Sequence, residues 1–439
     1  MTRLSRMSDG ARRFTNPRAV SRIILAIILV KAVLILGVLP EYRSSVSDSY
    51  GVGFADQYNV LANNIVAGHG YRFTPETAPT LTREPGYPLL LAGLFSIFAY
   101  TLLIAQAANL VLSAISAHLV SKLAKETWST PWPGLVAPLI YLLHPGVIVA
   151  EMRGGVEITF IFMLLCFVIA VLKALRSGRP TDYLIAGLVL GLTSLVRSTA
   201  LLFPLFLPVY FFLLEPVRPA LRTMALRLSM LFGVAALVMS PWILRNYALT
   251  QKIVPTASVQ GIAAHAGNYI CKNWSADKGF QALDREAARE RIELAEQMGY
   301  EFEDRYYIYF YDARDEVAFN SFLGQRVFGE YRDNPALLAK CMSRNAFNFW
   351  FSGKNRGSTM ANLLVQVPLL LLALAGLVTG WSRGDRRLIG FFALLIVYTM
   401  SVYLPIHAQA RYSVPLVPIL AILAAWPLSR LLNRGHQDQ

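Results

Sequence analysis

Residues 23–39 read IILAIILVKAVLILGVL, and this stretch decides the class of the protein. It follows an arginine-rich start, and no small-residue cleavage site comes after it, so we predict a retained membrane helix rather than a removed signal peptide. The rest of the 439-residue chain has the same character, because it is 55% hydrophobic and only 15% charged. A soluble protein carries about 25% charged residues. We therefore expect an integral membrane protein.

Further apolar stretches approach the roughly 20 residues that a spanning helix needs. They are residues 101–123, 132–149, 156–175, 182–196, 198–214, 222–244, 359–381, 388–405 and 411–429. The apolar run 86–100 is shorter and has Pro85 and Pro88 at its start. The pattern predicts an all-α polytopic membrane protein with a bundle of about ten transmembrane helices.

Basic residues gather at one set of helix ends, and loops rich in lysine and arginine stay on the cytoplasmic side. The clusters are the N-terminus, Lys173/Arg176/Arg179, Arg218/Arg222, Arg383/Arg386/Arg387 and Arg430/Arg434. They share one side only if the run 86–100 does not cross the bilayer, so we predict an interfacial helix there and cytoplasmic termini. This placement explains the net charge of +14 through topology and lipid phosphate, without a nucleic acid.

The predicted topology divides the chain into five parts. They are a cytoplasmic basic N-terminus (1–22), a transmembrane core with an outer loop at 40–100 (23–245), an extracytoplasmic loop region (246–357), C-terminal transmembrane helices (358–429) and a cytoplasmic tail (430–439). The region 246–357 is too long for a simple connection, and we expect helices near 282–298 and 315–350. It holds Cys271 and Cys341, whose pairing in an oxidising compartment the sequence leaves open.

Ionisable residues at the outer helix ends are functional candidates, because charge near a membrane is costly. The topology places these residues at one surface: Asp48, Asp56, Arg83, Glu84, Glu151, Arg153, Glu157, Arg197, Arg245, His407 and Arg411, with Tyr412 beside the last. Arginine forks suit a phosphate, and a carboxylate suits removal of a hydroxyl proton. The simpler interpretation is a headgroup anchor for any single arginine and a loop or cap residue for either aspartate.

The sequence shows no metal-ligand spacing, no Walker loop and no glycine-rich dinucleotide motif. Outer carboxylates are nevertheless the ligand type that a divalent cation prefers. The sequence therefore allows such a cation without requiring one, and it names no other cofactor.

Motifs in the first outer loop resemble a known family. They are Phe54-Ala55-Asp56-Gln57-Tyr58, Leu61-Ala62-Asn63, Gly68-His69-Gly70-Tyr71 and Arg83-Glu84-Pro85-Gly86-Tyr87-Pro88. This loop is similar to that of the membrane-embedded GT-C glycosyltransferases, especially the bacterial branch similar to protein mannosyltransferases and the lipid A aminoarabinose transferase. Further matches follow in the expected order: His144-Pro145 with Arg153 and Glu157, Leu195-Val196-Arg197-Ser198, Pro241-Trp242 with Arg245-Asn246-Tyr247, and Arg411-Tyr412 with Pro415 and Pro418.

The resemblance implies a GT-C-like bundle with horizontal helices in the first outer loop and a transferase that uses a polyprenyl-phosphate-linked sugar donor. It implies a glycan or glycolipid acceptor, such as lipid A, lipopolysaccharide or a polysaccharide, and a periplasmic site in the bacterial cytoplasmic (inner) membrane. An acidic residue of the first loop would lie beside the acceptor. Asp56 matches that position best, and Asp48 is the rival, because the aminoarabinose branch has a paired Asp-Glu where Asp56 stands alone.

These inferences assign roles to the outer residues. The expected phosphate holders are Arg83, Arg197, Arg245 and Arg411, with further substrate contacts from Tyr58, Glu84, Arg153, His407 and Tyr412. Asp56 or Asp48 removes the acceptor proton, and Glu157 binds sugar hydroxyls or positions the base. A single base without a protein nucleophile predicts inversion at the sugar carbon. Two alternatives stay open: a lipid-linked sugar carrier, which predicts mid-membrane charges and broken helices, and a partner-binding scaffold.

Overall fold

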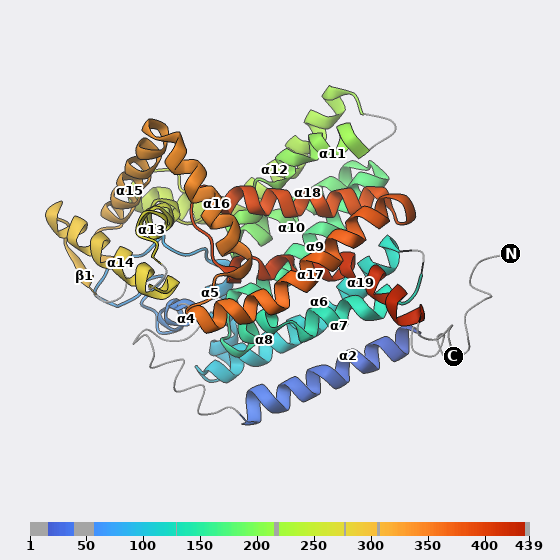
Figure 1. Ribbon diagram of the computed structural model, residues 1–439. Coiled ribbons are helices and arrows are strands. Elements are labelled where there is room, and N and C mark those ends of the chain that lie inside the picture. Colours follow the sequence, from blue (N-terminus) through green and yellow to red (C-terminus); the bar gives the residue numbers. More distant parts are fainter. Residues whose placement is uncertain are drawn as a thin grey trace.

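The computed structural model describes residues 16–38, 57–128, 130–214, 219–275, 278–304 and 308–434. Two regions are visible in Figure 1: a bundle of long helices, and a smaller group at the end of the bundle away from the start of α2 (Pro17–Ala32). We call the smaller group the outer helical cluster. It comprises α13 (Gln260–Lys272), α14 (Phe280–Gln297), α15 (Ala313–Asp333) and α16 (Pro335–Phe351).

Seven helices in the described part of the chain are long and apolar enough to cross a membrane. They are α2 with its π-helical extension η2 (Val33–Val38), α6 (Leu102–Thr127), α9 (Val156–Ser177), α12 (Leu221–Thr250), α17 (Arg356–Arg383), α18 (Arg386–Tyr403), and α19 (Val417–Arg434) with the turns η6 (Ala410–Tyr412) and η7 (Val414–Leu416) before it. The protein is therefore an all-α multi-pass membrane protein, apart from one short hairpin among the described residues, β1 (Phe302–Asp304) with β2 (Ile308–Phe310).

Two of the predicted spans are not single straight helices. Residues 132–149 form α7 (Pro133–Leu143) and α8 (Pro145–Met152), which are bent by 52° at His144. The break follows from Pro145, because proline disfavours a helical residue before it and cannot donate its own backbone hydrogen bond. Residues 198–214 form η4 (Ser198–Ala200), η5 (Phe203–Phe206) and α11 (Leu207–Leu214). With α10 (Pro180–Val196) also short, the total of ten spans stays a prediction.

The basic helix ends lie together at one end of the bundle, as the sequence predicts. Arg176 at the end of α9 pairs with Glu126 near the end of α6 at 2.8 Å. The backbone N–H of Asp385, between α17 and α18, donates to the carbonyl of Thr127 at 3.1 Å. At the same end, Arg227 of α12 reaches the carbonyl of Gly178. The outer helical cluster lies at the opposite end (Figure 1).

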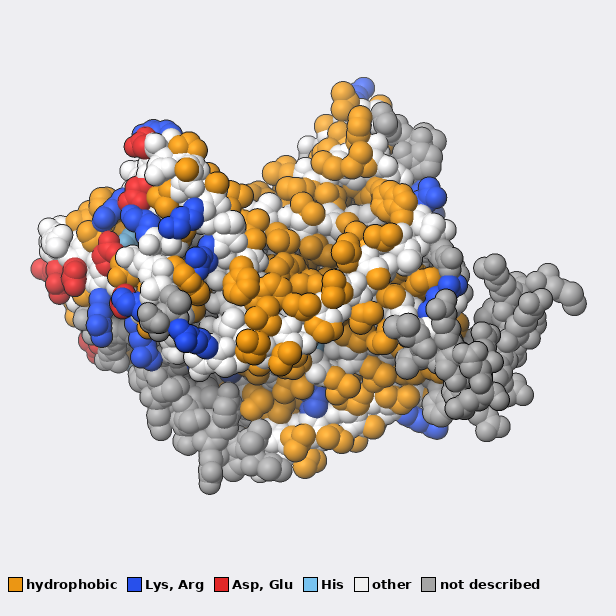
Figure 2. Space-filling model, viewed as in Figure 1, with side chains coloured by type: hydrophobic (Ala, Val, Ile, Leu, Met, Phe, Trp, Pro, Cys, Tyr) orange, Lys and Arg blue, Asp and Glu red, His pale blue; other side chains and the backbone are white. Residues whose placement is uncertain are grey.

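The bundle packs its backbones closely and turns apolar side chains outward. A Cβ on Gly376 of α17 would overlap the carbonyl oxygen of Leu423 in α19, so only glycine permits this approach. Close contact at small residues is how membrane helices associate, because lipid supplies no hydrophobic driving force between them. On the outside, Leu237 of α12 is 71% exposed. Figure 2 shows such side chains spread over the face of the bundle.

Two short helices of the first outer loop cover the end of the bundle. They are α4 (Tyr58–Val66) and α5 (Gly86–Ile97). With 12 residues, α5 is about 18 Å long, which is shorter than the roughly 30 Å hydrocarbon core, in accord with the predicted interfacial helix. A Cβ on Gly86 would lie 2.8 Å from the carbonyl oxygen of Leu195. This loop therefore rests directly on the end of α10.

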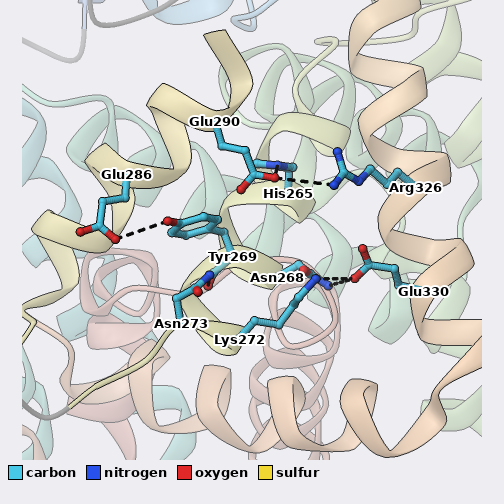
Figure 3. A network of polar contacts seen from close by, with 9 residues as sticks. All are labelled: His265, Asn268, Tyr269, Lys272, Asn273, Glu286, Glu290, Arg326 and Glu330. Atoms are coloured by element: carbon cyan, nitrogen blue, oxygen red, sulfur yellow. Dashed lines mark hydrogen bonds and ion pairs between the residues drawn. The ribbon is translucent and has the colours of Figure 1, made fainter. Parts of the chain in front are cut away.

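The outer helical cluster is held by a covalent bond and by polar contacts. The disulfide Cys271–Cys341 joins α13 to α16 across 70 residues and answers the question that the sequence left open. Figure 3 shows α13 between α14 and α15, with Tyr269 donating to Glu286 at 3.3 Å and Lys272 pairing with Glu330 at 3.0 Å. The predicted helical stretches correspond to α14, α15 and α16, whereas α13 was not predicted.

Candidate active site

The candidate site is centred on Arg197, the residue that ends α10. Its backbone is extended, with φ −155° and ψ 121°, so the side chain leaves the helix axis and enters the protein interior. The guanidinium lies 4.0 Å from Glu157 in the first turn of α9, and only 14% of the Arg197 side chain is exposed. Its Nη1 has no hydrogen-bond partner among the described residues. A buried cation with donor capacity left over is suited to an anion.

Tyr412 brings a second arginine to the same place. The guanidinium carbons of Arg197 and Arg411 lie 5.4 Å and 5.5 Å from the centre of its ring. Tyr403 stacks on Tyr412 at 4.7 Å. With its amide turned to satisfy its neighbours, Gln409 accepts hydrogen bonds from Arg411 Nε at 2.9 Å and from the Tyr412 hydroxyl at 3.0 Å. Segments far apart in the sequence therefore present two cations around one aromatic ring.

Glu84 fixes the first outer loop to this centre. One oxygen of its carboxylate, Oε1, accepts hydrogen bonds from the backbone N–H and the hydroxyl of Ser198, at 3.1 Å and 2.8 Å. The Tyr71 hydroxyl donates to the carbonyls of Arg83 and Glu84 at 3.0 Å and 3.1 Å. Glu84 was predicted to contact substrate, and the structure gives it an anchoring role next to Arg197.

Arg83 and Tyr58 of the first outer loop lie beside the centre. The guanidinium of Arg83 lies 5.7 Å from the ring centre of Tyr58, and Tyr58 is also among the electrostatic neighbours of Arg197. Tyr58 packs edge-on against Tyr87, whose hydroxyl donates to the carbonyl of Gly154. The first loop, α8 and α10 therefore meet around these residues.

A small cavity lies between the first outer loop and the outer helical cluster. Its volume is about 60 Å³, and Gln57, Arg83, Arg291 and Glu316 are among its lining residues. Gln57 is only 2% exposed. Its Nε2 donates to the Tyr309 hydroxyl, whereas its Oε1 has no hydrogen-bond partner in the described part of the chain. An unused buried acceptor in a cavity is the place where a ligand hydroxyl gains a hydrogen bond.

Glu316 and Arg245 form hydrogen bonds with residues 80 and 81 of the first outer loop. Burial raises the pKa of Glu316 to about 7, and its carboxyl receives hydrogen bonds from the Thr80 hydroxyl and the Leu81 N–H, both at 2.7 Å. Arg245 donates to the Thr80 carbonyl at 3.0 Å and lies over Trp242 at 4.5 Å. The structure thus commits the guanidinium of Arg245, a predicted phosphate holder, to loop carbonyls.

The remaining residues predicted for the site are His407, Arg153, Asp48 and Asp56. His407 packs between Phe280 and Tyr412, and burial lowers its pKa to about 4, so it is neutral near pH 7 and supplies no charge to a phosphate. Arg153 follows α8, is half-buried and forms no side-chain ion pair within the described ranges. Asp48 and Asp56 lie outside the described residues.

Glu151 corrects an expectation. It was counted among the outer-surface carboxylates, but it is fully buried and pairs with Lys31 of α2 at 2.6 Å. Lys31 also donates to the carbonyl of Leu142 at 3.0 Å. The bundle therefore contains a buried pair of charged side chains, with Lys31 inside a spanning segment. The signal was present in the sequence, because a lysine inside an apolar run requires a partner.

Several residues of the site were not predicted. Gln57 and Ser198 stand in the motifs quoted above but were given no role. Arg291, Glu316 and Tyr403 were not singled out, because such residues of loops and outer helices carry no distinctive spacing. Among the described residues, no group of three or more His, Cys, Asp or Glu side chains lies close enough together to hold a metal ion.

Comparison with known proteins relates this geometry to a fold. Residues 79–244 match the family described as dolichyl-phosphate-mannose-protein mannosyltransferase. A search of curated proteins finds no significant match by sequence. The oligosaccharyltransferase AglB from Archaeoglobus fulgidus is similar in structure: one complex, with an inhibitory peptide and a dolichol-phosphate, has 14% identity over 94% of this chain and a TM-score of 0.54. An oligosaccharyltransferase of the same organism, tethered via a disulfide bond with an acceptor peptide containing the NVT sequon, has 15% identity over 97% of this chain and a TM-score of 0.58.

The present chain spans about half of those proteins, 51% in both cases. ArnT from Cupriavidus metallidurans, bound to undecaprenyl phosphate, is 14% identical over 93% of this chain and 78% of its own length, with a TM-score of 0.41. The two Archaeoglobus fulgidus structures share the overall fold of this chain.

Proposed function

We propose that this chain, whose fold is similar to that of the oligosaccharyltransferase AglB, transfers a sugar from a polyprenyl-phosphate donor to an extracytoplasmic glycan or glycolipid, as the resemblance to GT-C glycosyltransferases implies. The observation that carries the proposal is the pair Arg197 and Arg411 around Tyr412, with Glu157 beside Arg197. Two guanidiniums at the end of an apolar bundle suit a lipid-linked phosphate. The AglB complex with a dolichol-phosphate supports this type of ligand.

Apolar side chains surround the arginines on the side of the bundle. A narrow pocket is lined by Phe160, Phe203, Leu395 and Leu416, together with Tyr403 and Tyr412 of the site. The pocket therefore ends at the ring that both arginines approach. Its volume is only about 10 Å³, so we assign the phosphate alone to Arg197 and Arg411 and leave the polyprenyl chain on the apolar surface of the bundle.

Transfer forms a bond between the acceptor oxygen and the anomeric carbon and breaks the bond from that carbon to the phosphate oxygen. The departing polyprenyl phosphate gains negative charge, which Arg197 and Arg411 stabilise. The acceptor proton passes to a carboxylate, for which we propose Asp56, with Asp48 as the rival. Attack opposite the leaving group inverts the anomeric centre.

The cavity at Gln57 and Arg83 lies on the acceptor side in this scheme. Asp56 directly precedes Gln57 in the chain, and Gln57 Oε1 has an unused acceptor there. Glu84 keeps the first loop against Ser198, beside Arg197. Glu157 orients the guanidinium of Arg197 from α9. In this scheme Tyr58 and Arg83 lie between the donor phosphate and the acceptor cavity. We place this arrangement on the periplasmic side of a bacterial inner membrane.

The test is transfer from a panel of radiolabelled polyprenyl-phosphate sugars by purified protein in detergent. Arg197→Gln is expected to lower kcat/KM by about 10²–10³-fold, the usual effect of losing one donor to the developing charge. Arg176→Gln, at the opposite end of the bundle, is the matched control and should retain activity. Asp56→Asn is expected to abolish transfer, whereas full activity in that variant moves the base to Asp48. No turnover or donor hydrolysis with any donor would contradict the proposal.

A carrier for lipid-linked sugars is the second candidate, because the structure has two features that it predicts. These are the buried pair Lys31–Glu151 and the bend between α7 and α8. Liposomes separate the two functions. A carrier moves the labelled lipid across the bilayer and leaves the sugar on its phosphate, whereas the proposed transferase yields a glycosylated acceptor and free polyprenyl phosphate.

A further inference from the structure

A groove lies at the basic end of the bundle, between the start of α2 and the end of α6. Its volume is about 370 Å³, and its lining includes Val20, Ser21, His118, Lys122 and Lys125. A second groove of about 340 Å³ lies on the α9 side of α6, and Lys122 lines it as well. Both are far from the candidate active site, because the outer helical cluster marks the other end of the bundle (Figure 1).

One face of α6 changes from apolar to basic as it reaches the first groove. Val111, Ile115, His118 and Lys122 follow one another at intervals of three or four residues, which places them in one stripe. Val111 is 59% and Ile115 42% exposed. Lys122 lies about 30 Å along the helix from Leu102, close to the thickness of the hydrocarbon core. The stripe is therefore apolar where lipid chains lie and basic where headgroups lie.

The two lysines of the groove have no ion-pair partner in the described part of the chain. Glu126 lines both grooves, and its carboxylate pairs with Arg176 at 2.8 Å. His118 contacts the Ser21 hydroxyl at 3.2 Å and the Ala114 carbonyl at 2.8 Å. Since the local carboxylate is already neutralised, Lys122 and Lys125 leave an uncompensated positive charge inside the groove.

We propose that this groove binds the phosphate of an anionic phospholipid, whose acyl chains lie along the exposed face of α6 at Ile115 and Val111. Lys122 and Lys125 hold the phosphate, and the Ser21 and Ser121 hydroxyls are within the same lining. A free phosphate would use the lysines alone, whereas a lipid also covers the apolar stripe that continues from them. Basic pockets between membrane helices bind anionic headgroups in this manner.

The chain offers a matched control on α2. Arg18, Arg22, Leu25 and Leu29 form a similar basic-to-apolar stripe, and both arginines are exposed, but neither lines the groove. Lys122→Gln/Lys125→Gln and Arg18→Gln/Arg22→Gln therefore remove equal charge from the same end of the bundle. They differ only in whether the groove loses its cations.

The experiment measures bound lipid by native mass spectrometry after equilibration with equal amounts of phosphatidylglycerol and phosphatidylcholine. We expect the wild type to retain phosphatidylglycerol preferentially and the groove variant to bind it at least about tenfold more weakly, since each lysine near an anionic headgroup contributes about 1 kcal/mol. The α2 variant and Lys122→Arg/Lys125→Arg should stay within about twofold of the wild type.

Inorganic phosphate at the same concentration is expected not to displace the lipid. Equal losses in the two glutamine variants, equal binding of both lipids, or displacement by inorganic phosphate would overturn the proposal. Thermal unfolding of each variant verifies that the bundle is intact. The experiment measures bound lipid and no turnover, so its result is independent of the proposed transferase activity.

Discussion

The helical bundle and the outer helical cluster both consist of packed helices, but different contacts hold the helices together in the two regions. The bundle exposes apolar side chains over its face, whereas the surface of the cluster mixes acidic and basic side chains (Figure 2). Lipid provides no hydrophobic force between helices, so the bundle relies on backbone contacts such as Gly376 on Leu423 and on paired polar groups. The cluster is small and faces water, and it adds a disulfide and ion pairs to its apolar contacts.

The candidate site lies where the two regions meet. The bundle supplies Arg197, Glu157 and Arg411, whereas the cluster closes the Gln57 cavity with Arg291 and Glu316. The regions are also in tight contact, because a Cβ on Gly267 of α13 would overlap the carbonyl oxygen of Ile406. We expect substitutions at buried or covalent contacts to lower stability and substitutions at exposed contacts to have little effect. Four substitutions test this expectation.

The largest effect is expected from the buried ion pair of the bundle. Lys31→Met leaves Glu151 buried without its partner, and breaking such a pair costs about 3–5 kcal/mol. Thermal unfolding in detergent measures the loss. Lys31→Met/Glu151→Gln removes both charges and should recover most of the stability, because no unpaired charge remains. A double variant as unstable as the single one would show that the pair is not the cause.

The disulfide of the cluster comes next. Cys271→Ser is expected to lower the stability of the cluster by about 2–4 kcal/mol, because the bond closes a long loop. Cys166→Ser in α9 is the matched control, because Cys166 is the free cysteine within the described residues, and it should be close to neutral. Unfolding followed with and without reductant checks both, and an equal shift in the two variants would refute the assignment.

A smaller, pH-dependent effect is expected where the cluster meets the first loop. Because burial raises the folded pKa of Glu316 to about 7, its contribution to stability is full below the unfolded pKa. That contribution is lost as the pH rises from the unfolded pKa to about 7, by at most about 3 kcal/mol. Glu316→Gln should remove this part of the pH dependence. The measurement is the unfolding temperature of wild type and Glu316→Gln from pH 4 to pH 8. Glu286→Gln, at a partly exposed glutamate of the same cluster, is the control and should keep the pH dependence of the wild type.

The smallest effect is expected at the surface of the cluster. Lys278 and Glu286 pair at 2.8 Å, but both side chains are largely in water. Exposed ion pairs are screened and contribute little, so Lys278→Gln should leave the unfolding temperature unchanged within error. A loss as large as that of Lys31→Met would mean that burial does not separate the two regions as described.

Hydropathy and charge along the chain were sufficient to predict the class of the protein and which helix ends lie on the same side. Long apolar runs are sufficient for a membrane protein, because the backbone must satisfy its hydrogen bonds internally in lipid. The basic clusters fixed which helix ends lie together, and the contact of Arg176 with Glu126 agrees with them. The order of Glu157, Arg197 and Arg411 at alternate helix ends also placed them at the other end.

Which of these side chains meet depends on how the helices pack against one another. Glu151 pairs with Lys31, 120 residues away, and Glu84 binds Ser198, 114 residues away, although neither pairing has a periodicity to reveal it. The unused acceptor of Gln57 likewise depends on Tyr309 and the outer helical cluster. Hydropathy and charge select a side of the membrane because they are summed over many residues. A hydrogen bond depends on the positions of two atoms, and these are set by how all the helices pack.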